Sequence, residues 1–210
     1  MEFNLKQILE SGNVNELRAD ENHIRMTPLI KFALRGDMDS VVKLLNAGAN
    51  PNIGDDWGCT PLEIACKTCN IKLCKILLLH GANPNHKNIE LQTPLMEVAK
   101  PSKIFGSIYD KNIYIEITKL LLEYGADTYI RDIYNKDIMN YLEYYKCYKM
   151  DVHNRMEKLI IRWRAALIIQ YNIKAKLFRN RIKKRIETKK LLLKETVLPM
   201  DLIKIVKGYV

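Results

Sequence analysis

The apolar residues between Thr60 and Gly81 form two clusters, which are separated by the polar pair Cys69-Asn70. Thr60-Pro61 is a typical helix start, because a threonine hydroxyl caps free backbone N–H groups and proline at the first helical position removes a donor that had no partner. Gly81 is a matching helix end, since glycine adopts the left-handed conformation without a Cβ penalty. The pattern therefore predicts two short antiparallel helices, and the Asn- and Pro-rich stretch 83–93 after them predicts an extended turn or hairpin.

This unit recurs along the chain. Thr-Pro-Leu begins at Thr27, Thr60 and Thr93, which are 33 residues apart, and the phrase Gly-Ala-Asn-Pro-Asn at 48–52 returns 33 residues later at 81–85. A fixed period of 33 residues with this phrase resembles the ankyrin repeat family. The resemblance implies an all-α fold, an ankyrin-repeat solenoid of helix-turn-helix units with short hairpin loops. Neighbouring units share a core there, because one unit cannot bury its own apolar face.

Two departures from the period mark the C-terminal half of the solenoid. Gly125 lies 44 residues after Gly81, so the third unit carries an insertion of 11 residues near 100–114, between its two helices. Asp137 stands where the next threonine is expected, which makes the fourth unit degenerate. The predicted division is a degenerate N-terminal capping repeat (1–24), three repeats (25–57, 58–90 and 91–134), a degenerate C-terminal repeat (135–157), a basic helix (158–192) and a terminal helix (193–210).

The net charge of +10 comes entirely from the C-terminal part of the chain. Residues 1–150 hold 18 Lys and Arg against 19 Asp and Glu, whereas residues 151–210 hold 16 against 5. The near-neutral repeats give no electrostatic reason to expect nucleic acid there. No run of 18 apolar residues occurs and the N-terminus lacks a signal-peptide core, so we expect a soluble, intracellular and cytoplasmic protein.

Neither proline nor glycine occurs from Asp151 to Leu198, and apolar residues recur every three or four positions, which predicts a long basic amphipathic helix. Within it, one group of residues resembles an IQ motif: Ile169, Gln170, Lys174, Arg179 and Ile182. The resemblance implies calmodulin or a related EF-hand protein as partner, although Ala175 replaces the usual glycine. Three alternatives remain open for this helix: packing onto the last repeat, binding nucleic acid, and binding an anionic membrane surface.

The end of the chain carries a shorter pattern. Leu198, Pro199 and Leu202 resemble the opening of an F-box, which implies the adaptor subunit of a cullin-type ubiquitin ligase as partner. Many ankyrin proteins of large DNA viruses end in such an element, and the Ile-, Asn- and Lys-rich style of this chain is similar. The same pattern is also a good start for an ordinary terminal packing helix.

Catalytic and metal chemistry has no visible place in the sequence. Cys66 and Cys69 form a C-x-x-C pair, but no second pair lies at ligand spacing, so we expect buried reduced thiols and neither a metal nor a cofactor. His23 and His153 are isolated, which favours surface positions. No nucleophile and base set or phosphate-binding glycine loop occurs, and the sequence therefore predicts a protein that is not an enzyme.

The ankyrin resemblance implies where a target protein would bind. Partners of that family contact the hairpin tips and the exposed ends of the first helices, which here are His23, Ile24, Met26, Leu34, Arg35, Asp56, Trp57, Lys67, Thr68, Ile89, Glu90 and Gln92. Trp57 at a tip is either a binding hot spot or a plate that packs on the neighbouring hairpin. The histidine that usually follows Thr-Pro-Leu is Ile30, Glu63 and Met96 in this chain, so we expect the inter-loop hydrogen bond of the family to be missing.

Overall fold

The protein is described by a computed structural model, which covers residues 4–100, 112–145 and 151–195, with side chains described up to residue 188. The chain divides into two compact units, with the boundary after Trp163. Unit 1 holds the helices α1 (Leu5–Ser11), α2 (Pro28–Arg35), α3 (Met38–Asn46), α4 (Pro61–Lys67), α5 (Ile71–Leu79), α6 (Pro94–Ala99), α7 (Asn112–Glu123) and α8 (Ile138–Tyr145), together with the first part of α9 (Asp151–Glu195). Two short antiparallel strands, β1 (Arg18–Ala19) and β2 (Arg25–Met26), form the first hairpin, with Arg18 opposite Met26.

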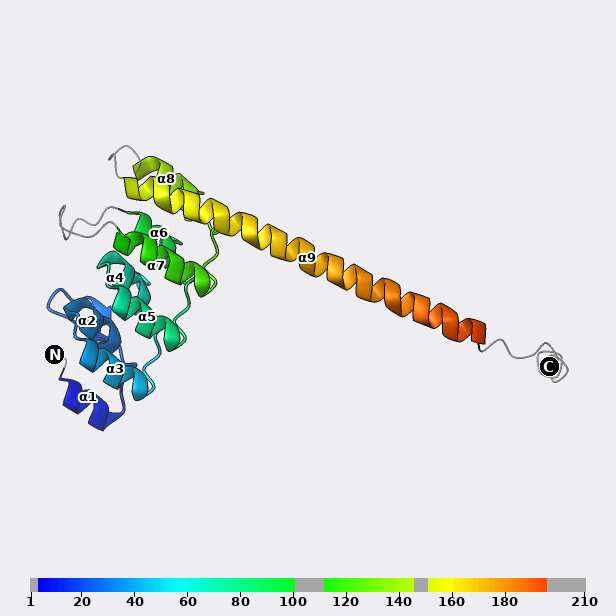
Figure 1. Cartoon of the computed structure of the whole chain (residues 1–210). Coiled ribbons are helices and arrows are strands. Elements are labelled where there is room, and N and C mark those ends of the chain that lie inside the picture. Colours follow the sequence, from blue (N-terminus) through cyan, green and yellow to red (C-terminus); the bar gives the residue numbers. More distant parts are fainter. Residues whose placement is uncertain (1–3, 101–111, 146–150, 196–210) are drawn as a thin grey trace, which may run out of the picture. The chain divides into compact units, whose positions relative to one another are not determined.

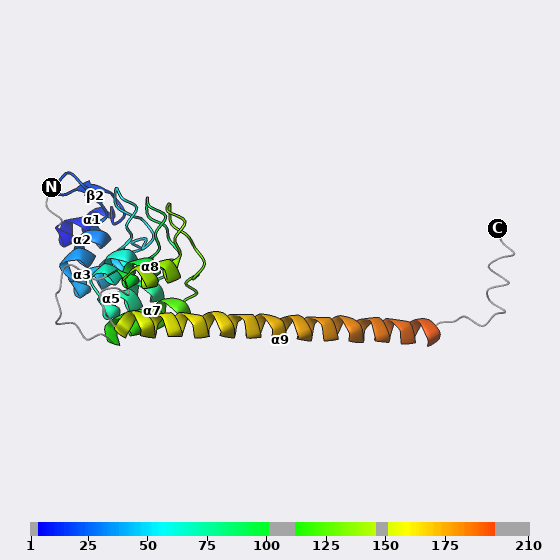
Figure 2. The ribbon, with the colours of Figure 1, turned by 90° about the horizontal axis from the view of Figure 1, so that it is seen from above.

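The helices of unit 1 stack as pairs. α2 with α3, α4 with α5, and α6 with α7 are successive helix pairs, and the loops before α4, α6 and α8 project side by side (Figures 1 and 2). The predicted pair between Thr60 and Gly81 is confirmed as α4 and α5. The insertion of the third unit falls between α6 and α7, and its residues 101–111 lie outside the described residues. The predicted terminal helix at 193–210 also falls largely outside them.

The helix starts and ends follow from the residues that mark them. Thr27 Oγ1 accepts a hydrogen bond from the Ile30 N–H (3.3 Å), and Thr60 Oγ1 accepts one from the Glu63 N–H (3.4 Å). At the third start Thr93 makes no such bond. At the fourth start, Asp137 Oδ1 accepts from the N–H groups of Met139 and Asn140, so aspartate performs the capping that Thr27 and Thr60 perform at the first two starts. The glycines of the helix ends are left-handed as expected, with φ of 86° at Gly48, 83° at Gly81 and 85° at Gly125.

An asparagine ladder ties each unit to the next. Asn52 Nδ2 donates to the Gly81 carbonyl (3.0 Å), and Asn52 Oδ1 accepts from the Asn83 N–H (2.7 Å). Asn15 makes the same pair of bonds one unit earlier, and Asn85 makes it one unit later. The recurring phrase Gly-Ala-Asn-Pro-Asn thus supplies both ends of an inter-unit contact. In the third unit Tyr129 occupies the position of these asparagines, so the ladder ends there.

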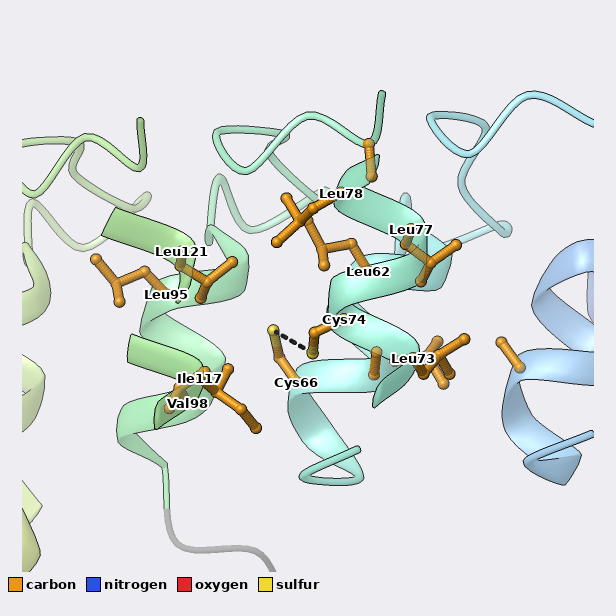
Figure 3. Packing of buried hydrophobic residues seen from close by; sticks show 14 of the residues in the cluster. Leu62, Cys66, Leu73, Cys74, Leu77, Leu78, Leu95, Val98, Ile117 and Leu121 are labelled. Atoms are coloured by element: carbon orange, nitrogen blue, oxygen red, sulfur yellow. Dashed lines mark hydrogen bonds between the residues drawn. The ribbon is translucent and has the colours of Figure 1, made fainter. Parts of the chain in front are cut away.

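The core of unit 1 is apolar and continuous across the helix pairs (Figure 3). Leu62, Leu73 and Leu77 are fully buried between α4 and α5, and Leu95, Ile117 and Leu121 continue the core into the third pair. Cys66 and Cys69 are buried as predicted. Cys74 is buried as well, and the Sγ atoms of Cys66 and Cys74 lie 4.0 Å apart (Figure 3). Burial and the neighbouring Cys74 raise the pKa of the Cys66 thiol well above its usual range, so this sulfur is an unreactive packing atom.

The last helix closes the solenoid before it leaves unit 1. Val152, His153, Met156 and Ile160 of α9 are buried, and the His153 ring nitrogen Nε2 lies 3.1 Å from the Ala99 carbonyl oxygen at the end of α6. The surface position expected for His153 was therefore wrong, because the residue is only 4% exposed and its ring stacks on Tyr145. α9 runs without a break through the boundary expected between residues 157 and 158. Its first turns belong to the repeats, and its remainder forms unit 2.

Candidate functional site: hairpin tips and helix α9

The three hairpins before α4, α6 and α8 are built on one local turn. Asp55 Oδ1 accepts hydrogen bonds from the N–H groups two and four residues later, those of Trp57 (3.0 Å) and Cys59 (2.8 Å). Asn88 and Asp132 make the same two bonds in the next hairpins. A side chain that bonds its own backbone in this way holds a turn of fixed shape. The sequence signal for this turn is an Asp or Asn five residues before the helix cap, which the repeat period alone does not reveal.

Neighbouring hairpins are joined by backbone hydrogen bonds at their tips. The Asp56 N–H donates to the Arg25 carbonyl (3.2 Å), the Ile89 N–H to the Trp57 carbonyl (3.0 Å), and the Ile133 N–H to the Glu90 carbonyl (3.1 Å). Each tip is thereby held at a fixed position relative to the next. These backbone hydrogen bonds link the tips without interruption from the first hairpin to the fourth.

Large apolar side chains stand exposed along the linked hairpin tips. We call them the tip row: Trp57 (47% exposed), Ile89 (63%), Leu91 (42%), Ile133 (52%) and Tyr134 (66%). Leu91 has a φ of 58°, the left-handed conformation that Gly58 adopts at the matching position of the preceding hairpin. A bulky residue in this conformation is strained, and strain of this kind clusters at functional sites.

The structure places most of the predicted binding residues at the surface. His23, Leu34, Arg35, Asp56, Trp57, Ile89 and Glu90 are exposed, and Ile24, Lys67 and Thr68 are half-buried. Asp56 is already occupied, because its carboxylate forms an ion pair with Arg25 (3.0 Å) and accepts from the Arg25 N–H (2.8 Å). The backbone N–H and the guanidinium of Arg25 accordingly lower the pKa of Asp56.

The exposed position expected for two predicted binding residues, Met26 and Gln92, was wrong. Met26 is 3% exposed and belongs to the apolar core, and Gln92 is 5% exposed. Gln92 Nε2 donates to the Tyr141 hydroxyl (2.8 Å), and its Oε1 accepts from Lys100 Nζ (2.6 Å). Position within a tip could not reveal these contacts, because the partners of Gln92 come from the end of α6 and from α8. Both side chains therefore pack inside the protein and stabilise the hairpins, and neither is available to a partner.

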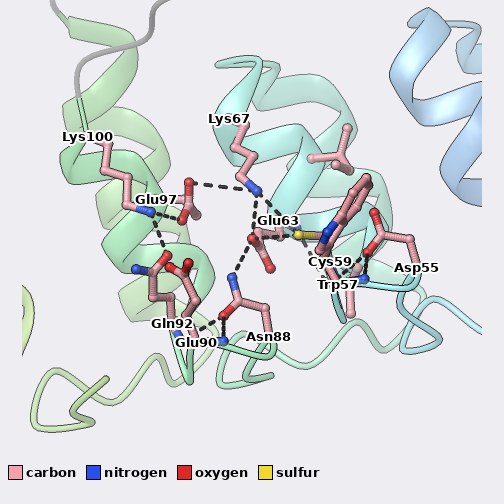
Figure 4. A network of polar contacts seen from close by, with 12 residues as sticks. Asp55, Trp57, Cys59, Glu63, Lys67, Asn88, Glu90, Gln92, Glu97 and Lys100 are labelled. Atoms are coloured by element: carbon pink, nitrogen blue, oxygen red, sulfur yellow. Dashed lines mark hydrogen bonds and ion pairs between the residues drawn. The ribbon is translucent and has the colours of Figure 1, made fainter. Parts of the chain in front are cut away.

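A buried polar network runs beneath the tip row (Figure 4). Glu63 Oε1 accepts from Lys67 Nζ (2.9 Å), Asn88 Nδ2 (3.0 Å) and Cys59 Sγ (3.2 Å), and the Glu63 side chain is 1% exposed. Lys67 Nζ also lies 4.0 Å from Glu97 Oε2, and Lys100 forms a further ion pair with Glu97. The network therefore connects the second unit to the third.

This network corrects the expectation that the inter-loop hydrogen bond is missing. Glu63 occupies the position of the usual histidine, and it accepts from Asn88 of the next hairpin. Although burial lowers the pKa of Lys67, the carboxylates of Glu63 and Glu97 outweigh that effect and raise it above its ordinary value. Burial, followed by the Glu63 carboxylate, raises the pKa of the Cys59 thiol to about 12. Glu63 Oε1 is thus an acceptor surrounded by the protonated donors Lys67 and Cys59 and by the Asn88 amide, and none of these side chains is an activated nucleophile.

Unit 2 presents a second candidate surface on α9. From Arg164 to Thr188 the helix carries eight Lys or Arg and a single acid, Glu187. Its apolar side chains are exposed, including Ile169 (59%), Phe178 (63%) and Ile182 (42%). The predicted IQ-like residues Gln170, Lys174 and Arg179 are exposed as well.

These apolar residues form two stripes on the helix. At 100° per residue, Ile169, Ile173 and Leu177 share one stripe, whereas Leu167, Phe178 and Ile182 lie on the other side. Ile169 and Ile182 are about 140° apart around the helix and roughly 20 Å apart along it. A single flat surface cannot cover both stripes at once.

Other candidate chemistry is limited in the part of the chain that the structure describes. No three His, Cys, Asp or Glu side chains converge there as a possible metal site. None of the helices in the described ranges combines the length and the apolarity that a membrane crossing needs. The F-box-like residues Leu198, Pro199 and Leu202 lie outside the described residues.

Comparison with known proteins agrees with the fold. Residues 3–88 match a family model that describes three copies of the ankyrin repeat. With the stacked helix pairs and projecting hairpins, this match establishes an all-α ankyrin-repeat solenoid.

Similar proteins carry the same repeats in different settings. The chain is 32% identical to the ankyrin repeat protein FPV222 of fowlpox virus over 123 residues, which cover 49% of this chain and 16% of that protein. It is 28% identical to the transient receptor potential channel pyrexia of Drosophila melanogaster over 152 residues (61% and 16%). It is 38% identical to the mouse 2-5A-dependent ribonuclease over 69 residues (32% and 9%). The aligned part thus spans a sixth or less of the length of each relative, and these relatives differ in function by name.

Proposed function

We propose that the protein is a non-enzymatic interaction adaptor, which holds a target protein on its ankyrin repeats and docks a second, EF-hand protein on α9. The tip row is the observation that carries the first part. Five large apolar side chains stand exposed on hairpins whose backbones are hydrogen-bonded to one another. Exposed aromatic residues on a rigid frame are enriched among binding hot spots.

The target is best sought among proteins of an infected host cell, since several of the similar proteins are from fowlpox virus. We would compare the proteins retained by the wild-type chain with those retained by the double variant Trp57→Ser/Ile89→Ser. We expect the double variant to lose a specific partner. Leu79→Ser is the matched control, because Leu79 is 63% exposed on α5 and does not belong to the tip row.

An identical set of partners for the wild type and the double variant would contradict a target site on the tip row. A partner lost equally with Leu79→Ser would show only a general loss of apolar surface. Circular dichroism of each variant checks that the helices remain. Neither outcome would bear on α9, which lies in a different part of the chain.

The second part of the proposal rests on the two apolar stripes and the charge of α9. A partner that buries both stripes must surround the helix, as a two-lobed EF-hand protein does around its target. The eight basic residues between Arg164 and Thr188 complement an acidic surface. A membrane surface contacts one side of a helix, so the two stripes favour the EF-hand partner over that alternative.

Calmodulin is the probe for this docking. Titration of the full chain with calmodulin, with and without calcium, should show saturable binding that Ile169→Asp weakens at least about tenfold. Asn172→Asp is the matched control, because it adds the same charge at an exposed position that the IQ-like pattern does not use. Absence of binding in both conditions, or equal weakening by the two variants, would exclude the IQ-like site.

Two other roles of the C-terminal part remain predictions. Binding to nucleic acid would fall steeply with salt and would respond little to Ile169→Asp. Recruitment of a ubiquitin-ligase adaptor subunit would be lost in Leu198→Asp/Leu202→Asp and kept in Ile169→Asp. These readouts separate the alternatives from the EF-hand proposal.

A further inference from the structure

A groove of about 400 Å³ lies where α2 and α4 end and α5 begins. Leu34, Ile71 and Ile113 supply apolar surface, and Arg35 and Lys72 supply positive charge. No Asp or Glu lines the groove. It lies at the opposite end of α2 from the hairpin, about 12 Å along a helix of eight residues.

The floor of the groove consists of two equivalent helix-end turns. Gly36 and Cys69 occupy the same register position, with φ of 68° and 51°, and each donates its N–H to the carbonyl three residues earlier (3.1 Å in both). The next N–H, of Asp37 or Asn70, donates to the carbonyl five residues earlier (3.1 and 2.9 Å). Cys69 holds this left-handed conformation despite having a side chain, which is a strained arrangement. The groove is therefore preformed by hydrogen-bonded backbone.

The polar groups around the floor are satisfied within the chain. The Thr68 hydroxyl donates to the Ile64 carbonyl (2.9 Å), and Asn70 Oδ1 accepts from the Leu73 N–H (3.0 Å). Asp37, which follows Gly36, directs its carboxylate to the Ser40 N–H (3.1 Å) and hydroxyl (2.6 Å). No ion pair of Arg35 or Lys72 occurs among the described residues. The groove thus offers a ligand apolar walls and two cations.

We propose that this groove binds a peptide segment of the target protein in which an apolar side chain is flanked by a carboxylate. The inference rests on the proposed binding of a target protein by the repeats and adds the chemistry of one contact. A volume of about 400 Å³ is at the lower end of the range for ligand pockets, so it admits one or two side chains and excludes a folded element. The flanking carboxylate pairs with Arg35, whose guanidinium can bind it in a bidentate manner, and with Lys72.

Selection from random dodecapeptides on the full-length protein tests this chemistry without knowledge of the target. We expect enrichment of peptides with a large apolar residue next to Asp or Glu. One enriched peptide, synthesised with a fluorophore, then gives a dissociation constant by fluorescence anisotropy. Replacement of its apolar residue by alanine, or of its acid by the amide, should weaken binding at least tenfold.

Protein variants locate the peptide. Arg35→Glu/Lys72→Glu should weaken peptide binding at least tenfold. If this charge reversal disturbs folding, the milder Arg35→Gln/Lys72→Gln replaces it and should weaken peptide binding by a smaller factor. Lys43→Glu/Lys75→Glu makes the same change of charge at exposed positions of α3 and α5 outside the groove and should leave binding unchanged.

Several outcomes would overturn the groove proposal. They are a selection that enriches no sequence, enriched peptides without an acid, equal weakening by the control pair, and binding that depends on Trp57 in place of Arg35. If the protein dimerises through Leu34 and the dimer does not bind the peptide, the groove is occupied by a second copy of the chain and the proposal is wrong. A tip-row partner that survives Arg35→Glu/Lys72→Glu while peptides are not enriched would overturn this inference and leave the proposed function standing.

Discussion

Asn85 Nδ2 donates a hydrogen bond to the Gly125 carbonyl oxygen at 2.9 Å, although 40 residues separate the two. Asn52 makes the same bond with Gly81 across 29 residues. The insertion between α6 and α7 therefore lengthens the third unit without changing its attachment to the second. The ladder depends on where the helices end in space, and sequence separation has little effect on it.

Removal of one asparagine of the ladder should loosen a single inter-unit contact. We expect Asn52→Ala to lower the free energy of unfolding by about 1–2 kcal/mol, because two hydrogen bonds to the next unit are lost. Urea titration followed by circular dichroism measures the change. Asn46→Ala, at an exposed position at the end of α3, is the control and should change stability by a few tenths of a kcal/mol at most. Equal effects of the two variants would show that the ladder contributes nothing specific.

At the strained tip residue Leu91, glycine should give a more stable protein than alanine, which is the reverse of the order in a helix. Leu91→Gly should be more stable than Leu91→Ala by about 1 kcal/mol, because a left-handed backbone penalises any Cβ. At Leu79, the last residue of α5, the order should reverse and alanine should be the more stable. Thermal unfolding of the four variants tests both signs. A Leu91→Ala chain as stable as Leu91→Gly would mean that the tip is not held in this conformation.

The buried network predicts a large effect of removing its central cation. Lys67→Met leaves the Glu63 carboxylate, which is 1% exposed, without its ion-pair partner. Because the Lys67 side chain is 36% exposed, we reduce the usual cost of breaking a buried pair and expect a loss of about 2 kcal/mol. Glu63→Gln/Lys67→Met should recover part of this loss, since no buried charge remains at position 63. A double variant no more stable than Lys67→Met would contradict the coupling between the two residues.

The thiols of Cys59 and Cys66 should resist modification in the folded protein. With a pKa of about 12, Cys59 has almost no thiolate at pH 8, and burial raises the pKa of the Cys66 thiol well above its ordinary value. Iodoacetamide labelling followed by peptide mapping should find both unmodified in buffer at pH 8 and modified in urea.

The raised pKa of Cys59 also fixes the direction of a pH effect on stability. The folded-state value lies above the unfolded value of 9.0, so the contribution of the thiol is complete below pH 9 and is lost as the pH rises toward 12. Cys59→Ser should flatten this loss of stability in alkaline solution. An unchanged pH dependence would show that the Cys59 thiol is not the group responsible.

The first turns of α9 should be needed for a stable solenoid. Met156 is fully buried, and Met156→Ala should cost about 2–4 kcal/mol. A chain that ends at Met150 loses the same cover, whereas a chain that ends at Arg164 keeps it and should unfold at a temperature close to that of the full chain. Leu167→Ala, at an exposed position of unit 2, is the control and should leave the melting temperature unchanged. A melting temperature that is the same for both truncations would contradict the capping role of α9.

Local sequence signals predicted the helix pairs because each signal acts within a few residues. Thr60-Pro61 caps the helix that it begins, and Gly81 ends the preceding one by its own backbone conformation. The same reasoning failed at Gln92 and His153, whose partners, Tyr141 and Ala99, are 49 and 54 residues away. A side chain whose burial depends on distant elements gives no local sign of it.

The sequence by itself determined the repeat, the solenoid and the division between neutral repeats and a basic helix, because periodic caps, apolar spacing and charge are properties of the chain. The tertiary structure decided which polar residues serve the frame and which face outward. Glu63 of α4 lies in the core with Lys67 and Asn88 as partners, while Trp57 on the hairpin before the same helix stays half exposed. The physical reason is that burial depends on how helices and hairpins pack together, and a charge is stable in the core only where the packed elements supply its donors.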